Sequence, residues 1–143
     1  MHLFNVAAVF RLLLLVGSEF SVSAFVNPSA WRLDPEPQAR MLGHYAAVLG
    51  KVMPMWYTAD LLLLGVETWL YRHTPGFVIL LTASVIWFLT VLATILFMVP
   101  LNNRVVEGAA GWQGIHRTWD RRHRVRIVAL AVASILFTYV AVR

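Results

Sequence analysis

The polar side chains that could carry out chemistry lie close to long apolar segments. In the stretch "FMVPLNNRVVE", two adjacent amides, Asn102 and Asn103, follow directly after an apolar run. Side-chain amide N–H groups can donate hydrogen bonds to an oxyanion that forms during a reaction. A helix cap would be the structural explanation, but a cap needs at most one residue in the left-handed conformation. Both explanations of the amide pair stay open at this point.

Two charged residues, Glu19 and Lys51, interrupt apolar segments from within. An ionisable side chain inside a membrane span is costly, and it therefore suggests a function and a charged partner. At a rise of about 1.5 Å per residue, both side chains lie roughly 10 to 14 Å from the same membrane face. We expect them to form an ion pair and consider both as substrate-binding residues. An ion pair that only fixes the helix register explains them equally well.

Two histidines, His44 and His123, are further candidates for chemistry. His44 precedes Lys51 by seven residues, which is two helical turns, so these side chains share a helix face. His123 belongs to a segment in which aromatic rings recur on one narrow helical face and arginines on the opposite one. The ring-bearing residues are Trp112, His116, Trp119 and His123. The pattern is typical of an interfacial helix, in which tryptophans and arginines anchor at headgroup depth.

The apolar segments that must position these side chains are long enough to cross a bilayer. Hydrophobic residues make up 59% of the 143 residues and charged residues only 13%, unlike a soluble domain. One span takes about 20 apolar residues, so the chain accommodates about four spans with short connections and no separate soluble domain. We therefore predict an all-α integral membrane four-helix bundle that forms a single domain over residues 1–143.

The predicted helices cover about residues 3–26, 41–71, 77–101 and 125–142. An interfacial amphipathic segment is expected before the last helix. Pro28, Pro35 and Pro37 should prevent the first helix from continuing, and Pro54 should kink the second.

The distribution of arginines predicts the orientation of the chain. The connections after the first and third apolar segments carry Arg32, Arg40, Arg104, Arg117, Arg121, Arg122, Arg124 and Arg126. The opposite face carries only Arg72 and Arg143. The positive-inside rule then places both termini of this multi-pass protein outside the cell (inner) membrane. The net charge of +5 therefore indicates orientation, and we expect no nucleic-acid partner.

The absence of cysteine from the sequence excludes a disulfide framework, a thiolate metal site and a thiol nucleophile.

The chain resembles the anthrone-oxygenase-like family of small four-helix membrane proteins, which is largely a domain of unknown function. The resemblance is carried by "FMVPLNNRVVE" and the later "WDRRHRVR". The resemblance covers most of the chain in layout, and its specific part is residues 99–107 and 119–124. It implies conversion of an anthrone, a polycyclic phenolic ketone, to an anthraquinone with molecular oxygen. The expected protein is therefore a membrane-embedded oxygenase, an oxidoreductase acting on a hydrophobic aromatic molecule.

The implied reaction needs a base, donors for an oxyanion and a dry pocket that admits oxygen. His44 and His123 are the candidate bases, because a neutral imidazole accepts a proton near physiological pH. Asn102 and Asn103 are the candidate donors, and Trp119 could stack on the aromatic rings of the substrate.

A metal ion such as iron or copper is one expectation for a cofactor, and no cofactor is the other. Glu19, His44 and His123 have the composition of a two-histidine, one-carboxylate site, which suits iron and oxygen chemistry. Their depths argue against such a site, since Glu19 should lie roughly 10 Å deeper than the two histidines.

Two other functions remain as alternatives. A glutamate in the first of four short helices is similar to small multidrug transporters, in which such a carboxylate binds protons and cations. The long arginine-rich connection argues against that resemblance. A non-catalytic accessory or lipid-binding subunit would need only the basic interfacial helix. The expected partners are a hydrophobic aromatic molecule, molecular oxygen and the lipid bilayer, and a homo-oligomer is compatible with the sequence.

Overall fold

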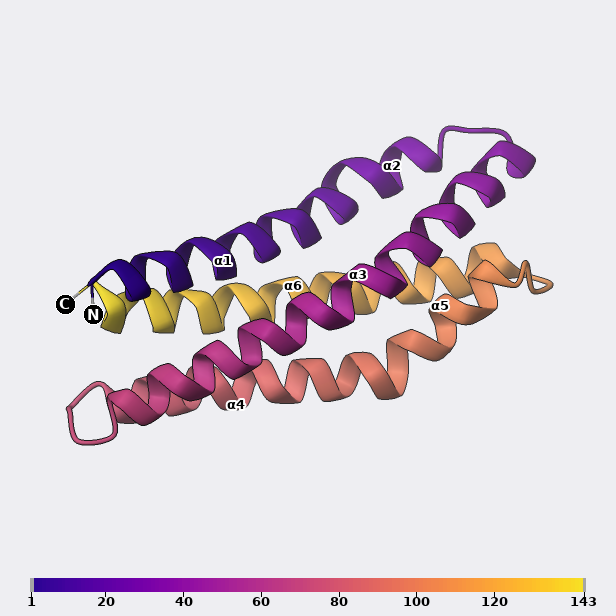
Figure 1. Ribbon diagram of the computed structural model, residues 1–143. Coiled ribbons are helices and arrows are strands. Elements are labelled where there is room, and N and C mark those ends of the chain that lie inside the picture. Colours follow the sequence, from indigo (N-terminus) through magenta and orange to yellow (C-terminus); the bar gives the residue numbers. More distant parts are fainter. Residues whose placement is uncertain (1, 143) are drawn as a thin grey trace.

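The computed structural model describes residues 2–142, which form helices joined by short turns. Within this range, four helical stretches are long and apolar enough to cross a membrane: Leu3–Ala30, Pro35–Leu70, Phe77–Val106 and Trp112–Ala141. The prediction of an all-α four-helix membrane bundle is confirmed. Figure 1 shows both chain ends at one end of the bundle and the turn between α5 and α6 at the other. Arg143, counted above on the outer face, lies outside the described residues.

Two of the four spans are built from more than one helical element. In chain order the elements are α1 (His2–Ser21), a π-helical turn (Val22–Val26), α2 (Asn27–Ala30), α3 (Pro35–Leu70), α4 (Phe77–Ala93), a second π-helical turn (Thr94–Met98), α5 (Val99–Val106) and α6 (Trp112–Ala141). We call α1, the first π-helical turn and α2 the first span, and α4, the second turn and α5 the third span.

Every helix extends further toward the arginine-rich end than the sequence predicted. The first span continues through Pro28 to Ala30, and α3 already begins at Pro35, because proline is well tolerated in the first turn of a helix. The last helix begins at Trp112 instead of near residue 125. The amphipathic segment expected before it is therefore continuous with it.

Both π-helical turns have the same sequence origin. Pro28 and Pro100 each follow the last residue of such a turn by two positions. Proline has no N–H group, and its ring crowds the carbonyl four residues earlier, which belongs to Ala24 or Leu96. In a π-helical turn each N–H group bonds to the carbonyl five residues earlier, so the helix is wider there. The wider turn accommodates the proline ring, and each span continues past its proline. Such turns often occur at functional sites.

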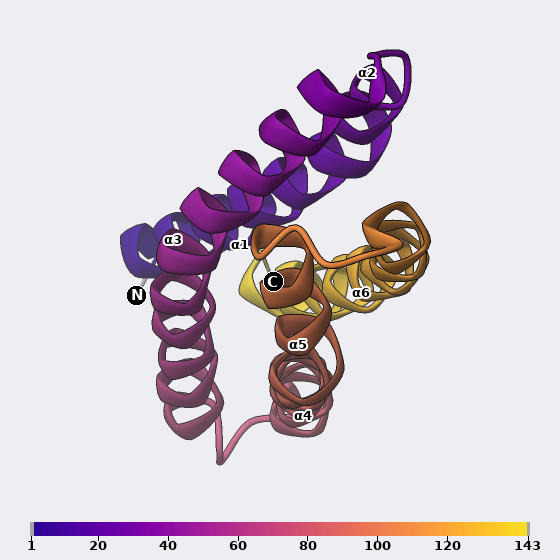
Figure 2. The same ribbon diagram turned by 90° about the vertical axis from the view of Figure 1, so that its right-hand side faces the viewer.

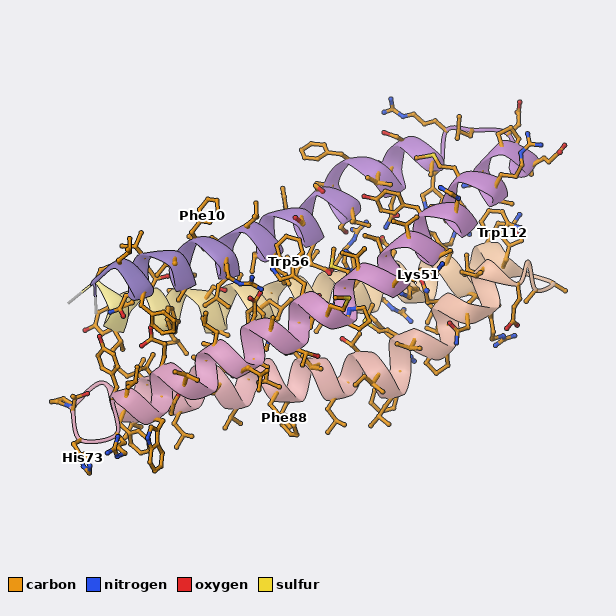
Figure 3. The ribbon with its side chains drawn as sticks, viewed as in Figure 1. Phe10, Lys51, Trp56, His73, Phe88 and Trp112 are labelled. Atoms are coloured by element: carbon orange, nitrogen blue, oxygen red, sulfur yellow. The ribbon has the colours of Figure 1, made fainter. Side chains whose placement is uncertain are left out.

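The apolar core lies between the helices in the half of the bundle that contains the chain termini. Its largest fully buried side chains are Trp87, Phe137, Leu12, Leu15, Leu64, Leu80 and Leu130. Phe10 and Phe88 instead point away from the bundle, as expected for residues that contact lipid (Figure 3). At the opposite end, α2 and the first turns of α3 lie to one side of α5 and α6 (Figure 2).

Candidate functional site

A column of stacked rings runs along the first half of α6. The ring centroids of His116 and Trp119 are 5.7 Å apart, and those of Trp119 and His123 are 4.6 Å apart, with nearly parallel planes. Trp31 contacts the column from the end of the first span, since its ring lies 6.4 Å from that of Trp112 and 5.8 Å from that of His116. The shared helical face predicted from the sequence is confirmed.

The column ends at a buried cluster of Glu19, His123 and Arg126. The guanidinium of Arg126 donates a hydrogen bond to the carboxylate of Glu19 and lies 2.8 Å from Nδ1 of His123. Nε2 of His123 is 3.0 Å from the backbone carbonyl of Glu19. Because a carbonyl can only accept, Nε2 carries the proton, and Nδ1 of the neutral ring accepts from Arg126. Nδ1 is also 3.1 Å from Oε2 of Glu19.

The expected ion pair between Glu19 and Lys51 is wrong. Lys51, labelled in Figure 3, is exposed on α3 and forms no ion pair among the described residues. Glu19 is only 2% exposed and binds Arg126. The reason is the early start of α6 at Trp112, which puts Arg126 about 21 Å into the helix. The same shift brings His123 to the level of Glu19, so the depth difference inferred between these two residues is wrong as well.

A cavity of about 170 Å³ opens beside this cluster, between α3, the third span and α6. Its polar lining residues are Glu19, Tyr57, Thr58, Thr94, Asn102, Asn103, Trp119 and Arg126, and the remaining lining is mostly aliphatic. Two of the lining residues carry a buried donor. Nε of Arg126 has no hydrogen-bond partner within residues 2–142, and the hydroxyl of Tyr57 makes no hydrogen bond of regular geometry, although it interacts with the carboxylate of Glu19. Buried donors normally have a full partner, so a ligand that accepts hydrogen bonds would satisfy both once small side-chain shifts expose them to the cavity.

The cavity lies where two helices depart from regular geometry. Pro54 lines it from α3 and cannot donate to the carbonyl of Gly50, another lining residue. On the opposite wall, Thr94, Ile95 and Met98 belong to the second π-helical turn. The cavity thus lies between the proline of α3 and the π-helical turn of the third span.

The structure brings only some of the candidate residues to this cavity. Asn102, Asn103, Trp119 and Glu19 line it, and Asn102 also donates to the carbonyl of Ala46 at 3.3 Å. His123 lies behind Trp119 and Glu19 and is not a lining residue.

His44 lies apart from this group, exposed on α3. The two candidate bases, His44 and His123, therefore do not line the cavity that contains the candidate donors Asn102 and Asn103. The catalytic and binding roles assigned to these residues, to Lys51 and to the other lining residues stay predictions.

The hypothesis of a metal site at Glu19, His44 and His123 does not fit the geometry. Glu19 and His123 are in contact, but His44 is exposed on another helix. Across residues 2–142, no three histidine, aspartate or glutamate side chains come together in an arrangement that could hold a metal ion.

A comparison with known protein families assigns the chain to one of them. The family described as "Anthrone oxygenase" matches residues 41–136, about two thirds of the chain. The chain belongs to the anthrone oxygenase family. The matched region contains Tyr57, Asn102, Asn103, Trp119 and Arg126, so most polar residues of the cavity lie within it. No match to a curated protein or to a solved structure was found.

Three site residues were not identified from the sequence: Tyr57, Arg126 and Asp120. Asp120 accepts hydrogen bonds from Asn27 and Ser23 and thereby fixes α6 against the end of the first span. A signal for Tyr57 was its position three residues after Pro54, and a signal for Arg126 was its place directly before an apolar run. From the sequence alone, Arg126 belongs to the arginines that indicate orientation, whereas the structure places it in a buried ion pair with Glu19.

Proposed function

We propose that this protein is a membrane-embedded oxygenase that oxidises an anthrone-like aromatic ketone with molecular oxygen in the 170 Å³ cavity. The supporting observation is the pair of buried donors, Nε of Arg126 and the poorly satisfied hydroxyl of Tyr57, on residues that line one cavity together with Trp119. Family membership supports an oxygenase-like reaction. The rings of the substrate would contact Trp119 and the aliphatic lining, and its oxygen would accept hydrogen bonds from the two donors.

The chemistry begins with removal of a proton from the CH₂ group opposite the ketone of the substrate. Negative charge then develops on the ketone oxygen, where the hydroxyl of Tyr57 and Nε of Arg126 can stabilise it. Oxygen adds to the deprotonated carbon and takes up a proton, giving a hydroperoxide. Loss of the second proton from this carbon breaks the O–O bond and releases hydroxide, which becomes water on protonation. One anthrone and one O₂ thus give one anthraquinone and one water, and no other reductant is needed.

Glu19 is the base that the geometry favours over His44. Its carboxylate lines the cavity, whereas His44 is exposed elsewhere on α3. His123 lies behind Glu19, with Nδ1 at 3.1 Å from Oε2, and would accept the proton from the carboxylate after Nδ1 releases its hydrogen bond from Arg126. His123 would therefore act as a proton relay through Glu19, without touching the substrate.

Oxygen uptake by the purified protein tests the proposed reaction. With 9-anthrone as substrate, we expect consumption of one O₂ per anthrone, above the rate of spontaneous oxidation in a protein-free sample, with anthraquinone as product and no accumulation of hydrogen peroxide. If oxygen uptake stays at the protein-free rate and liposomes instead show proton-coupled flux of the compound, the transporter alternative is favoured.

We also propose that both termini lie outside and that the arginine-rich turn is cytoplasmic. The chain contains no cysteine, so Ala110→Cys and Thr74→Cys each introduce a single thiol, in the two turns at opposite ends of the bundle. An impermeant thiol reagent added to intact cells should label the cysteine at position 74 and leave the one at position 110 unlabelled until the membrane is permeabilised. The reverse labelling would contradict the orientation.

A further inference from the structure

One side of the cavity is a slot between α3 and the third span. The exposed lining residues form two stripes, with a spacing of four residues in each: Gly50, Pro54 and Thr58 on α3, and Ile95, Val99 and Asn103 on the third span. Residues four positions apart lie on the same helix face, so each stripe is one edge of the slot. Eight residues of helix correspond to a length of about 12 Å.

The slot opens toward the part of the surface that faces lipid. Its neighbours Met55 and Leu96 are 76% and 56% exposed, although both are apolar. Asn103 is three residues from the end of its helix, about 5 Å, whereas Ile95 is about 16 Å from it. One end of the slot is thus polar and close to the headgroups, and the other lies at the depth of the acyl chains.

A much smaller cavity lies toward the arginine-rich end of the bundle. This second cavity, of about 30 Å³, is lined by residues that include Leu42, Val105 and His116. This volume holds about one or two water molecules and no aromatic ring. Leu49, Asn102 and Trp119 line both cavities and form the wall between them.

The size of the main cavity also favours access through the slot. An apolar cavity of about 150 Å³ admits a molecule of the size of benzene. A molecule with several fused rings is larger than that, so part of it would remain between the edges of the slot while its leading end reaches Tyr57 and Arg126.

We propose that the cavity is loaded sideways from the bilayer by a planar aromatic molecule, which enters between α3 and the third span with its hydroxyl or keto group toward Tyr57 and Arg126. The aromatic body is soluble in the acyl-chain region, and its polar group suits the interface. The inference rests on the proposed function only in taking this cavity as the substrate site, and binding can be measured without turnover.

Photolabelling in liposomes tests the slot directly. The probe is 4-hydroxybenzophenone, an apolar aromatic ketone with a phenolic hydroxyl, which is dissolved in the lipid and activated by light. We expect labelled peptides to contain cavity residues such as Met53 and Met98, and excess 9-anthrone to suppress this labelling. Thr58→Trp and Ile95→Trp fill the slot from opposite edges and should each lower the labelling at least about tenfold, equivalent to about 1.4 kcal/mol of binding free energy.

The matched controls are Met55→Trp and Leu96→Trp, which add the same side chain to the lipid-facing surface beside the slot. Both controls should label within about twofold of the unmodified protein, a difference below 0.5 kcal/mol on the same scale. Thermal unfolding verifies that each variant is folded, and either slot variant alone suffices for the comparison. Undiminished labelling of a folded slot variant, or an equal loss in the controls, would overturn the proposal. Slot-dependent labelling without anthrone-dependent oxygen uptake would sustain the slot and refute the oxygenase.

Discussion

Tyr57→Phe should lower the rate of anthrone oxidation by a factor of about 10² or more, because it removes one of the two donors proposed to hold the developing oxyanion. The same change should leave the free energy of unfolding unchanged or slightly raised. The hydroxyl is buried and makes no hydrogen bond of regular geometry within residues 2–142, although it interacts with Glu19, so its loss removes a poorly satisfied polar group. The phenylalanine ring would keep the contact with Trp87, whose ring centroid lies 6.3 Å away.

Tyr71→Phe is the matched control for this experiment. The hydroxyl of Tyr71 accepts a hydrogen bond from Asn5 at 2.9 Å near the other end of the bundle. Its removal should lower the free energy of unfolding by about 1 kcal/mol and leave the oxidation rate unchanged. Tyr57→Phe should therefore lower the oxidation rate without lowering stability, and Tyr71→Phe should lower stability without lowering the rate. Oxygen uptake measures the rate, and unfolding in mixed detergent measures the stability. Full activity of Tyr57→Phe would exclude this hydroxyl from the reaction.

Arg126→Leu should lower the free energy of unfolding by about 3–5 kcal/mol, because it leaves the carboxylate of Glu19 buried without its cation. Arg126 is the ion-pair partner of Glu19 and also donates to His123, so both lose a donor. Replacing Glu19 by Leu as well removes the uncompensated charge. The double variant should therefore recover much of the lost stability, although it should not oxidise anthrone.

Arg124→Leu is the control on the same helix. Arg124 pairs with Asp120 at 2.9 Å, but its side chain is 64% exposed, so this pair contributes at most about 1 kcal/mol. Unfolding in mixed detergent compares the unmodified protein with Glu19→Leu, Arg126→Leu, the double variant and Arg124→Leu under one condition. If the losses at Glu19 and Arg126 simply add in the double variant, the two residues are not coupled and the cluster is misassigned.

The sequence by itself determined the membrane architecture. Hydrophobic residues make up 59% of the chain and occur in segments of span length, and this property depends on local composition alone. The shared face of Trp112, His116, Trp119 and His123 was equally predictable, because it follows from helical periodicity within one segment. The family resemblance carried by residues near Asn102 and Asn103 is confirmed by the match over residues 41–136.

The helix ends were less predictable, for a reason that concerns the solvent. In water, a proline such as Pro28 is a good indication that a helix stops. A bilayer provides no hydrogen bonds to free backbone groups, so continuing the helix through a π-helical turn is favoured over ending it. The longer helices moved His123 and Arg126 from a presumed interfacial segment into the bundle.

Only the tertiary structure decided which polar groups meet. A sequence gives the depth of Glu19 along its own helix, but the choice between Lys51 and Arg126 as its partner depends on the start, rotation and register of the other helices. The surroundings of the Tyr57 hydroxyl are a second case, since they depend on atoms of other helices, among them the carboxylate of Glu19. The cavity is likewise lined by residues of helices that are distant in sequence, and no local pattern of residues predicts how far apart those helices lie.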